Sequence, residues 1–493
     1  MRLQTLTPEN PLGLDDPSLF IQCAIVNGAH VASETTFAVD NPATGEQIGT
    51  CPDLGIDEAR GAIDAAHAAF QSFKHTPALE RQAHLLKLHA LLLTHADDLA
   101  RLIVWENGKA WGDAVAEVAY AASYVLWFAG EAVRQNGEVL PPSGVNRNFV
   151  LRAPVGVCAL LLPWNFPIGM IARKVAPVLA TGCTAVVKVP AETPYTNLAF
   201  VELVHRAGVP PGVVNVVTTH AHLVAVGAEL TTNPKIAKVS FTGSTRVGKI
   251  LAAQAASTLK KLSLELGGNA PLIVFADAHL PTAVAGTLAS KFRGSGQTCV
   301  CANRIYVHDD VYEQFSAALA AEVAKFVPGA GFEDGVTHGP LIHKAAADKV
   351  MQHLADAVAH GARVVAGGKR LSDTLIQPTV LVDVEPDCLL STEETFGPLA
   401  ALIRFSTEEE VVALANRSEV GLAGYFFSCD ADRIWRVAEA LEVGMVGANT
   451  GAISNAMVPF GGVKESGYGK EGGRDGTDEY VVKKLVVVGS ALG

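Results

Sequence analysis

The sequence has few cysteines, no recognisable metal-binding motif and no excess of positive charge. Its 493 residues include eight cysteines, and neither a CxxC pair nor an HExxH segment occurs. We therefore expect neither a disulfide scaffold nor a bound metal such as zinc. Thirty-eight lysines and arginines stand against fifty aspartates and glutamates, which gives a net charge of −12. Because a nucleic-acid binder carries a basic surface, this balance excludes nucleic acid as a partner.

Long hydrophobic runs are also absent. The longest apolar stretch, Val118–Gly130, has thirteen residues, whereas a helix that spans a membrane needs about 20. The first twenty residues lack the apolar core of a signal peptide and the arginine-rich, acid-poor composition of a transit peptide. We expect a cytoplasmic protein that has no membrane partner.

The composition instead suits a large folded protein. Apolar residues make up 49% of the chain and charged residues 18%, so intrinsic disorder is excluded. At about 150 residues per domain, the length predicts two or three domains. Helical periodicity dominates the first third, and from residue 155 short apolar strands alternate with helices. Strands are predicted at 157–162, 185–189, 213–217, 236–241, 272–275 and 304–308.

This alternation predicts the fold class. Strands that alternate with helices form parallel sheets with right-handed crossovers. We therefore expect an α/β protein in which an open, doubly wound nucleotide-binding domain is followed by a second α/β domain that begins near residue 268. The Val-rich tail Tyr480–Val488 is predicted to be a further strand, which needs a partner either within the chain or in a neighbouring subunit.

One glycine-rich turn is similar to a phosphate loop. The segment from Gly243 to Lys249 fits GxxxxGK, but Ile250 stands where a metal-binding Ser or Thr is required. In a strand–turn–helix context, the backbone N–H groups of Gly243 and Ser244 can still meet a phosphate. The motif favours a pyrophosphate site without metal over an ATPase, and on this motif alone a plain strand–helix turn explains the glycine equally well.

A candidate nucleophile follows a second glycine-rich segment. Cys299 comes directly after Gly294-Ser-Gly-Gln-Thr, and Cys301 is two residues further on. A cysteine in this position is nucleophilic if its thiolate is stabilised, whereas a lone cysteine is more often a small buried residue. Other segments of the sequence are needed to distinguish a catalytic cysteine from a structural one.

Three other segments supply groups that a thiol mechanism needs. Glu265 lies among apolar neighbours in LELGG and suits a general base, although it could also face solvent. Asn165 in PWNFP suits an oxyanion donor, although the segment could be an ordinary turn. Glu394 and Phe396 in EETFGP suit ribose hydroxyls and a stacked ring, although the segment could be an acidic loop. Together, in one chain with a doubly wound core, these signals favour catalysis.

With these motifs the sequence resembles the aldehyde dehydrogenase superfamily. The resemblance runs from Phe37 to Leu485 and includes PWNFP, FTGST, LELGG, GQTC, EETFGP and PFGGVKESGYGKEG. Within the superfamily the chain is most similar to the succinate-semialdehyde dehydrogenases, through LELGGNAP, GQTCVCANR and GMVGANTG. The resemblance implies NAD(P)-dependent oxidation of an aldehyde, expected to be succinate semialdehyde, to the acid. The alternatives are an aromatic, aliphatic or glutarate-semialdehyde substrate, or a non-catalytic nucleotide-binding protein of the same fold.

The resemblance also implies catalytic roles. Cys299 would attack the aldehyde and form a thiohemiacetal and then a thioester, while Asn165 and the Cys299 backbone N–H would hold the oxyanion. Glu265 would activate the water that releases the acid. In the succinate-semialdehyde group, a residue like Cys301 can form a reversible disulfide with the nucleophile, so Cys301 is a candidate redox residue.

A second set of roles concerns the small molecules. A substrate carboxylate would be held by Arg173, Arg293 and Ser454. The alternatives for the arginines are a solvated helix face for Arg173 and a structural ion pair for Arg293. The residues expected to bind NAD or NADP are Trp164, Lys188, Ala191, Glu192, Gly243, Ser244, Glu394 and Phe396.

One departure from the family pattern bears on the cofactor. Members that use NAD commonly have Glu three residues after the ribose-binding lysine, and here that position is Ala191. Alanine neither hydrogen-bonds a 2′-hydroxyl nor repels a 2′-phosphate, although Glu192 could restore part of the contact. We therefore expect NADP to be used at least as well as NAD.

The resemblance finally implies a domain layout and an assembly. Residues 1–135 and 157–267 would form the NAD(P)-binding domain and 268–478 the catalytic domain. Residues 136–156 and 479–493 would form a small β oligomerisation element. We expect the tail Tyr480–Val488 to pair with the hairpin of a neighbouring subunit in a homodimer or homotetramer.

Overall fold

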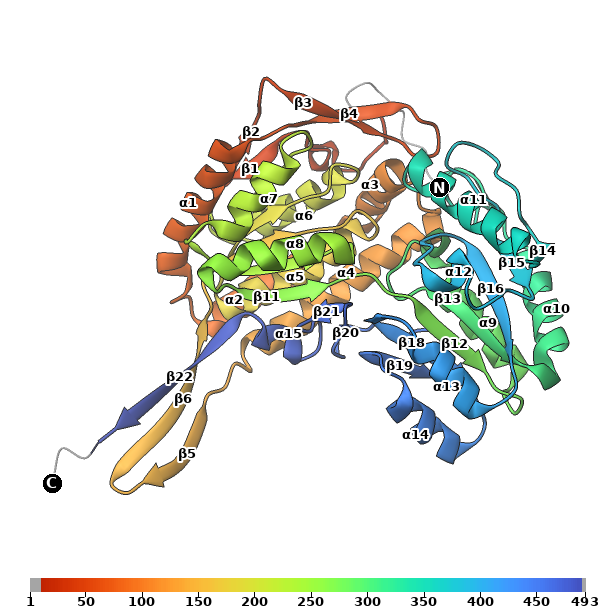
Figure 1. Ribbon diagram of the computed structural model, residues 1–493. Helices are drawn as coiled ribbons and strands as arrows, with labels where there is room; N and C mark the ends of the chain where they lie inside the picture. The colour runs from red at the N-terminus through yellow and green to blue at the C-terminus, as the bar shows by residue number, and fades with distance from the viewer. Residues whose placement is uncertain (1–9, 490–493) are drawn as a thin grey trace.

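The computed structural model describes residues 10–489 and shows two lobes and a projecting arm (Figure 1). Each lobe is built on its own sheet. The strands of the first sheet are β1 (Ala24–Val26), β2 (Ala29–Val31), β7 (Val157–Leu161), β8 (Thr184–Lys188), β9 (Val214–Val217), β10 (Ile236–Thr242), β11 (Lys261–Glu265) and β21 (Gly467–Tyr468). A separate hairpin, β3 (Thr36–Asp40) and β4 (Gln47–Pro52), lies beside this lobe.

The first sheet has the strand order β2-β1-β9-β8-β7-β10-β11-β21. From β9 to β11 all neighbouring strands are parallel. The order reverses at β7, because the chain adds β8 and β9 on one side and β10 and β11 on the other. In open α/β sheets such a switch point is where ligands bind, beyond the carboxyl ends of the strands. The short strand β21 joins this sheet from the segment that was predicted to be catalytic.

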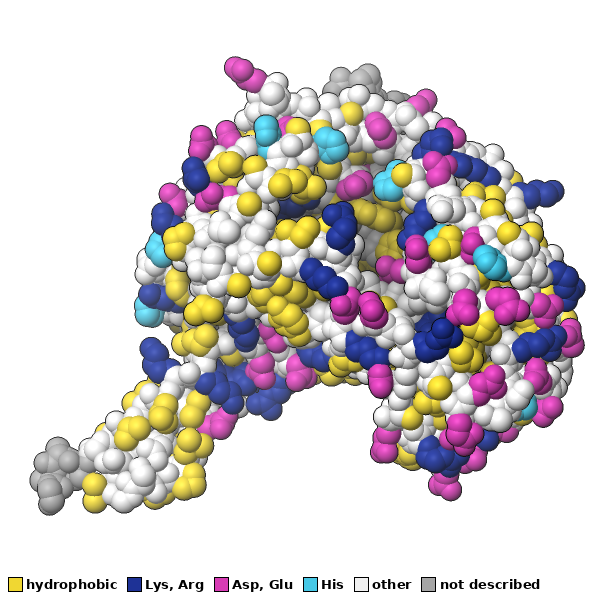
Figure 2. All heavy atoms as spheres, in the orientation of Figure 1, with side chains coloured by type: hydrophobic (Ala, Val, Ile, Leu, Met, Phe, Trp, Pro, Cys, Tyr) yellow, Lys and Arg dark blue, Asp and Glu magenta, His cyan; other side chains and the backbone are white. Residues whose placement is uncertain are grey.

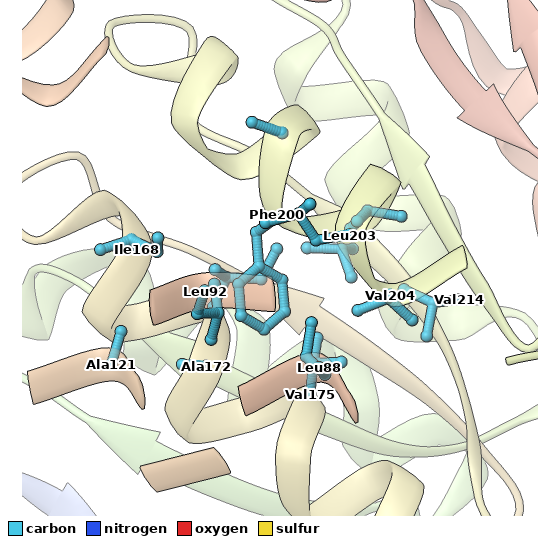
Figure 3. Close-up of a cluster of buried hydrophobic side chains, with 14 of the residues drawn as sticks. Leu88, Leu92, Ala121, Ile168, Ala172, Val175, Phe200, Leu203, Val204 and Val214 are labelled. Atoms are coloured by element: carbon cyan, nitrogen blue, oxygen red, sulfur yellow. The ribbon is translucent and has the colours of Figure 1, made fainter. Parts of the chain in front are cut away.

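Eight helices of the described chain pack around the first sheet (Figure 1). They are α1 (Ile56–Phe73), α2 (Ala78–Thr94), α3 (Ala96–Asn107), α4 (Trp111–Ala132), α5 (Pro167–Thr181), α6 (Pro194–Arg206), α7 (Leu223–Thr232) and α8 (Thr245–Ala255). Helix α5 begins with a proline, whose fixed φ suits the first helical position, and ends at Gly182 in the left-handed conformation with φ 84°. Leu88 and Leu92 of α2 pack with Val175 of α5 and Phe200 of α6 in the buried core (Figure 3).

The second sheet has the order β14-β15-β16-β13-β12-β18-β19, and only its edge strand β14 runs antiparallel. Its strands are β12 (Ala270–Val274), β13 (Ala302–His308), β14 (Arg363–Ala366), β15 (Thr379–Val382), β16 (Leu399–Phe405), β18 (Ala423–Phe427) and β19 (Met445–Ala448). The helices of this lobe are α9 (Leu280–Lys291), α10 (Tyr312–Val323), α11 (Lys344–Ala359), α12 (Leu389–Thr392), α13 (Glu408–Asn416) and α14 (Ala431–Ala440). The short helix α15 (Asp475–Asp478) packs instead against α5 of the first lobe. A two-residue pair, β17 (Val420–Gly421) and β20 (Val463–Lys464), completes the described strands of this part of the chain.

The arm is a three-stranded antiparallel sheet formed by one chain. It consists of β5 (Glu138–Ser143), β6 (Asn146–Pro154) and β22 (Val481–Val488) in the order β22-β6-β5. The expectation that the tail pairs with a neighbouring subunit was therefore wrong, because β22 pairs with β6 of its own chain from Val481–Pro154 to Val488–Arg147. The chain leaves α15 beside the base of β6, where Arg152 and Asp478 form an ion pair at 2.6 Å. The free strand edge nearest to β22 is therefore that of β6 in the same chain.

A short connection joins the two sheets. Glu265 ends β11 and Ala270 begins β12, so residues 266–269 carry the chain from the carboxyl edge of the first sheet to the amino edge of the second. Figure 2 shows the surface hollowed between the two lobes. Within residues 10–489, no helix is both long and apolar enough to cross a membrane.

Candidate active site

A cavity of about 190 Å³ brings together predicted site residues from four separate segments of the chain. Asn165 comes from the loop between β7 and α5, Arg173 from α5, and Ser454 from the loop after β19. Arg293 and Cys299 come from the segment between α9 and β13. The structure therefore gathers the predicted nucleophile, the predicted oxyanion donor and all three predicted substrate residues around one space. Cavities for drug-sized ligands are larger, about 300–1,000 Å³, so this one suits a small molecule.

Cys299 is half-buried at the end of a tightly wound loop. Gly294, Ser295 and Gly296 all have positive φ, of 57°, 56° and 77°. A Cβ at position 296 would lie 2.3 Å from the carbonyl oxygen of Gly397, so only glycine fits there. Burial raises the pKa of the Cys299 thiol to about 12, against the opposing positive charge of Arg173. The thiol is therefore neutral near pH 7 in this state.

Asn165 is buried, and its side chain reaches residues 294–299, which we call the nucleophile loop. Its Nδ2 donates a hydrogen bond to the carbonyl oxygen of Gln297 at 2.9 Å. An amide nitrogen carries two hydrogens, so one remains to face the cavity that Asn165 and Cys299 share.

Glu265 lies at the end of β11 and is only 2% exposed. Neither carboxylate oxygen accepts a hydrogen bond from a described residue. Burial raises the pKa of Glu265 well above its usual range, and the negative charge of Glu471 raises it further. A carboxyl group with a raised pKa is a stronger base once it is ionised. Glu265 is not one of the side chains that line the Cys299 cavity.

The two candidate substrate arginines have different surroundings. Arg173 is buried, and its Nη2 forms an ion pair with Glu471 Oε2 at 2.6 Å. It therefore does not lie on a solvated helix face. Arg293 is exposed and stacks over the Phe166 ring at 5.3 Å, and no described acidic side chain pairs with it. The third candidate, Ser454, shares a 2.5 Å hydrogen bond with the hydroxyl of Tyr120.

The predicted cofactor residues lie along the carboxyl edge of the first sheet and the facing edge of the second. Lys188 ends β8, and burial lowers the pKa of its ammonium group to about 8. That group forms no hydrogen bond or ion pair with a described residue. Ser244 caps the first turn of α8, where unpaired backbone N–H groups suit a phosphate. Gly243 precedes it and donates its N–H to the carbonyl oxygen of Glu265 at 3.0 Å.

The remaining predicted cofactor residues form two further groups. Trp164 and Phe396 pack edge to face with ring centroids 5.7 Å apart. Glu394 accepts a hydrogen bond from the Gly268 backbone at 3.1 Å, and burial raises the pKa of its carboxyl to about 7. Ala191 is half-buried and Glu192 is exposed, and both lie in the loop between β8 and α6. A buried unpaired cation, a free helix N-terminus and an aromatic pair together fit a dinucleotide.

Cys301 is buried behind the nucleophile loop. Its Sγ donates a hydrogen bond to the carbonyl oxygen of Lys291 at 3.2 Å, and burial raises the pKa of the thiol. All eight cysteines are unpaired. A redox-sensitive disulfide between Cys299 and Cys301 stays a prediction.

Several residues of the site were missed from the sequence. Asp113, Glu117 and Tyr120 line the cavity from α4, and Lys109 lines it from the turn before that helix. Their spacing of four and three residues places the α4 members on one helical face, which is a signal that the sequence does contain. The role of Glu471 as the partner of Arg173 has no local signal, because the two residues are far apart in the chain.

The fold and the arrangement of the site residues indicate the protein family to which this chain belongs. A model of the aldehyde dehydrogenase family matches residues 30–486, and the chain belongs to that family. It is an enzyme that oxidises an aldehyde to the carboxylic acid with NAD or NADP. The predicted resemblance and the α/β fold class are thereby confirmed.

The proteins similar to this chain include two named semialdehyde dehydrogenases and one solved structure. The chain is 53% identical to succinate-semialdehyde dehydrogenase (NADP(+)) 1 of Schizosaccharomyces pombe, over 97% of both chains. It is 51% identical to glutarate-semialdehyde dehydrogenase of Pseudomonas putida, over 96% of this chain and 99% of that one. The crystal structure of succinate-semialdehyde dehydrogenase from Burkholderia pseudomallei superposes with a TM-score of 0.95 at 52% identity, covering 97% of this chain and 100% of that one.

Proposed function

We propose that this enzyme oxidises succinate semialdehyde to succinate and uses NADP at least as well as NAD. The observation that carries the proposal is one small cavity in which Cys299 and Asn165 share the walls with Arg293, a cation that no described carboxylate neutralises. Such a cation suits an aldehyde that bears a carboxylate at its far end. The names of the similar proteins, which refer to succinate semialdehyde, glutarate semialdehyde and NADP, support this substrate and cofactor class.

The proposed reaction begins at sulfur. The Cys299 thiol loses its proton to solvent, a C–S bond forms to the aldehyde carbon, and the carbonyl electron pair moves onto oxygen. The Asn165 amide and the Cys299 backbone N–H stabilise this oxyanion. When the oxyanion collapses, the C–H bond breaks, hydrogen leaves with its electron pair as hydride, and a thioester remains.

The thioester is then hydrolysed. Glu265 turns towards the cavity and accepts a proton from water, whose oxygen attacks the thioester carbon. The C–S bond breaks, the acid leaves, and sulfur regains a proton. The raised pKa of Glu265, caused by burial and then by Glu471, suits this basic role.

The bound cofactor supplies the nicotinamide ring that accepts the hydride. We infer that Lys188 and Ser244 hold its adenosine and pyrophosphate part, because a buried unpaired ammonium group and a helix N-terminus both attract phosphate oxygens. Glu394 would accept hydrogen bonds from ribose hydroxyls. The packed rings of Trp164 and Phe396 would form a wall of the cofactor site next to that ribose.

The first prediction tests the chemistry. Cys299→Ala should abolish aldehyde oxidation, because no other group in the cavity can form the thioester. Glu265→Gln should still release a burst of about one equivalent of NADPH per active site and then turn over slowly, because acylation does not need the base. Stopped-flow absorbance measures both. Steady turnover of Cys299→Ala at the wild-type rate would contradict the assignment.

The second prediction separates the two arginines. Arg293→Ala should raise KM for succinate semialdehyde about 10- to 100-fold and leave hexanal oxidation unchanged, because a hydrogen bond to a charged group contributes about 1.5–3 kcal/mol. Arg173→Ala should slow oxidation of both aldehydes, since it leaves the buried Glu471 carboxylate without one of its partners. Steady-state kinetics on succinate semialdehyde, glutarate semialdehyde and hexanal make the comparison. An equal loss on all three for Arg293→Ala would show that Arg293 does not bind a substrate carboxylate.

The third prediction concerns the cofactor. Ala191→Glu should shift the ratio of kcat/KM for NADP and NAD at least tenfold towards NAD, because a carboxylate repels the 2′-phosphate and accepts a bond from the 2′-hydroxyl. Ala191→Gln is the matched control, since it keeps the size and removes the charge. If the wild type rejects NADP outright, Ala191 does not set the preference.

We also propose that the arm joins subunits into a homodimer or homotetramer. Apolar side chains are exposed along both faces of its sheet, and Figure 2 shows them gathered on the arm. They include Val139, Leu140, Val145, Leu151, Leu485, Val487 and Val488. A sheet with exposed apolar faces of this kind favours association with another protein chain. Light scattering should therefore give the mass of a dimer or tetramer, and a stable, active monomer would contradict the proposal.

The predicted domain layout and compartment remain proposals. We infer that the first sheet and its helices bind the cofactor and that the second sheet carries the nucleophile, with boundaries near 135, 156, 267 and 478. Residues 1–9 and 490–493 of that layout lie outside the described residues. The eight unpaired cysteines fit a reducing compartment such as the cytoplasm.

A further inference from the structure

Lys109 is a buried cation at the cavity wall that the reaction above does not use. It is only 5% exposed, and its Nζ contacts three partners. It forms a short ion pair with the Glu117 carboxylate, donates to the backbone carbonyl oxygen of Asn165 at 2.6 Å, and lies 3.8 Å from the centroid of the Phe166 ring. A buried ion pair is costly unless every charge is well coordinated. Here two of the three partners belong to the loop that carries the proposed oxyanion donor.

Glu117 holds the other end of the same loop. Its Oε2 pairs with Lys109, and its Oε1 accepts hydrogen bonds from the backbone N–H groups of Ile168 at 3.1 Å and Gly169 at 3.2 Å. These N–H groups belong to the first turn of α5, where a carboxylate is favoured. The Lys109–Glu117 pair thus fixes the backbone at Asn165 and at the start of α5, and only two residues separate these two points.

We propose that the Lys109–Glu117 pair is a positioning device that sets the Asn165 amide against the nucleophile loop. This inference rests on the proposed role of Asn165 as the oxyanion donor. The Asn165 backbone is held by Lys109, while its side-chain amide reaches the Gln297 carbonyl at 2.9 Å. Because an oxyanion donor acts only at hydrogen-bond distance, a shift of about 1 Å can cost up to about 100-fold in rate.

A direct contact between Lys109 and the substrate is the alternative, since Lys109 also lines the cavity. An ammonium group has three N–H donors. The carboxylate of Glu117, the carbonyl of Asn165 and the face of Phe166 occupy all three. Arg293, in contrast, has no ionic partner in the described chain. The geometry therefore assigns Lys109 to the loop and leaves the substrate carboxylate to Arg293.

A double-mutant cycle with Asn165 tests the proposal. The variant Lys109→Met/Glu117→Leu removes both charges, so that neither is left buried without a partner. The pre-steady-state rate of NADPH formation should fall about 10- to 100-fold, with KM for succinate semialdehyde changed less than about threefold. In an Asn165→Ala background the same double substitution should cause no further loss, because the donor that it positions is gone. Lys344→Met, which removes an exposed ion pair with Asp348, is the control and should keep the wild-type rate.

Three outcomes would overturn the inference. An equal further loss in the Asn165→Ala background would show that the pair acts independently of Asn165, with the proposed function intact. A rise in KM for succinate semialdehyde but not for hexanal would show direct substrate contact. An Asn165→Ala enzyme with the wild-type burst rate would contradict the oxyanion role itself and this inference with it. Circular dichroism and thermal unfolding verify folding, and if the double variant does not fold, Glu117→Gln takes its place in the cycle with the same expectation.

Discussion

The site depends on one buried carboxylate, that of Glu471. It pairs with Arg173 at 2.6 Å and with Lys174, two neighbouring residues of α5, and all three side chains are buried. Two cations in the interior would cost several kcal/mol each without a counter-charge. Glu471 comes from the segment after β21, so these ion pairs tie the C-terminal part of the chain to the first lobe. They also place a negative charge near Glu265, which adds to the effect of burial in raising the pKa of that carboxyl.

The cations around the site consequently fall into two groups. Arg173 and Lys109 are buried and neutralised by Glu471 and Glu117, so their charge holds the walls of the cavity in place. Arg293 and Lys188 form no ion pair with a described residue, although the charge of Glu192 acts on Lys188. They lie at the two places where anionic groups of the substrate and the cofactor are proposed to bind. The cavity around Cys299 is lined by two arginines and one lysine, and two of these three cations are paired with carboxylates, so its net positive charge is smaller than its composition indicates.

Much of this arrangement could be predicted from local patterns. Each predicted strand overlaps an observed one with ends that differ by no more than two residues, because apolar runs of four to six residues between glycines and prolines have few other ways to be buried. Cys299 and Asn165 were found because glycine-rich and proline-flanked loops hold a side chain in a fixed direction. The partner of β22 could not be predicted, since an apolar strand fits any free edge and only the route of the chain through α15 selects β6.

The sequence by itself determined the fold class, the family and the identity of the residues that can carry thiol chemistry, because these depend on short segments whose residue types and spacing are visible locally. The tertiary structure decided which charges cancel. The Arg173–Glu471 and Lys109–Asn165 contacts join residues that are far apart in the chain. The segment around Arg173 does not show whether this arginine is solvated, ion-paired or without a partner. Burial and electrostatic pairing depend on every element packed around a group, so they are properties of the folded chain as a whole.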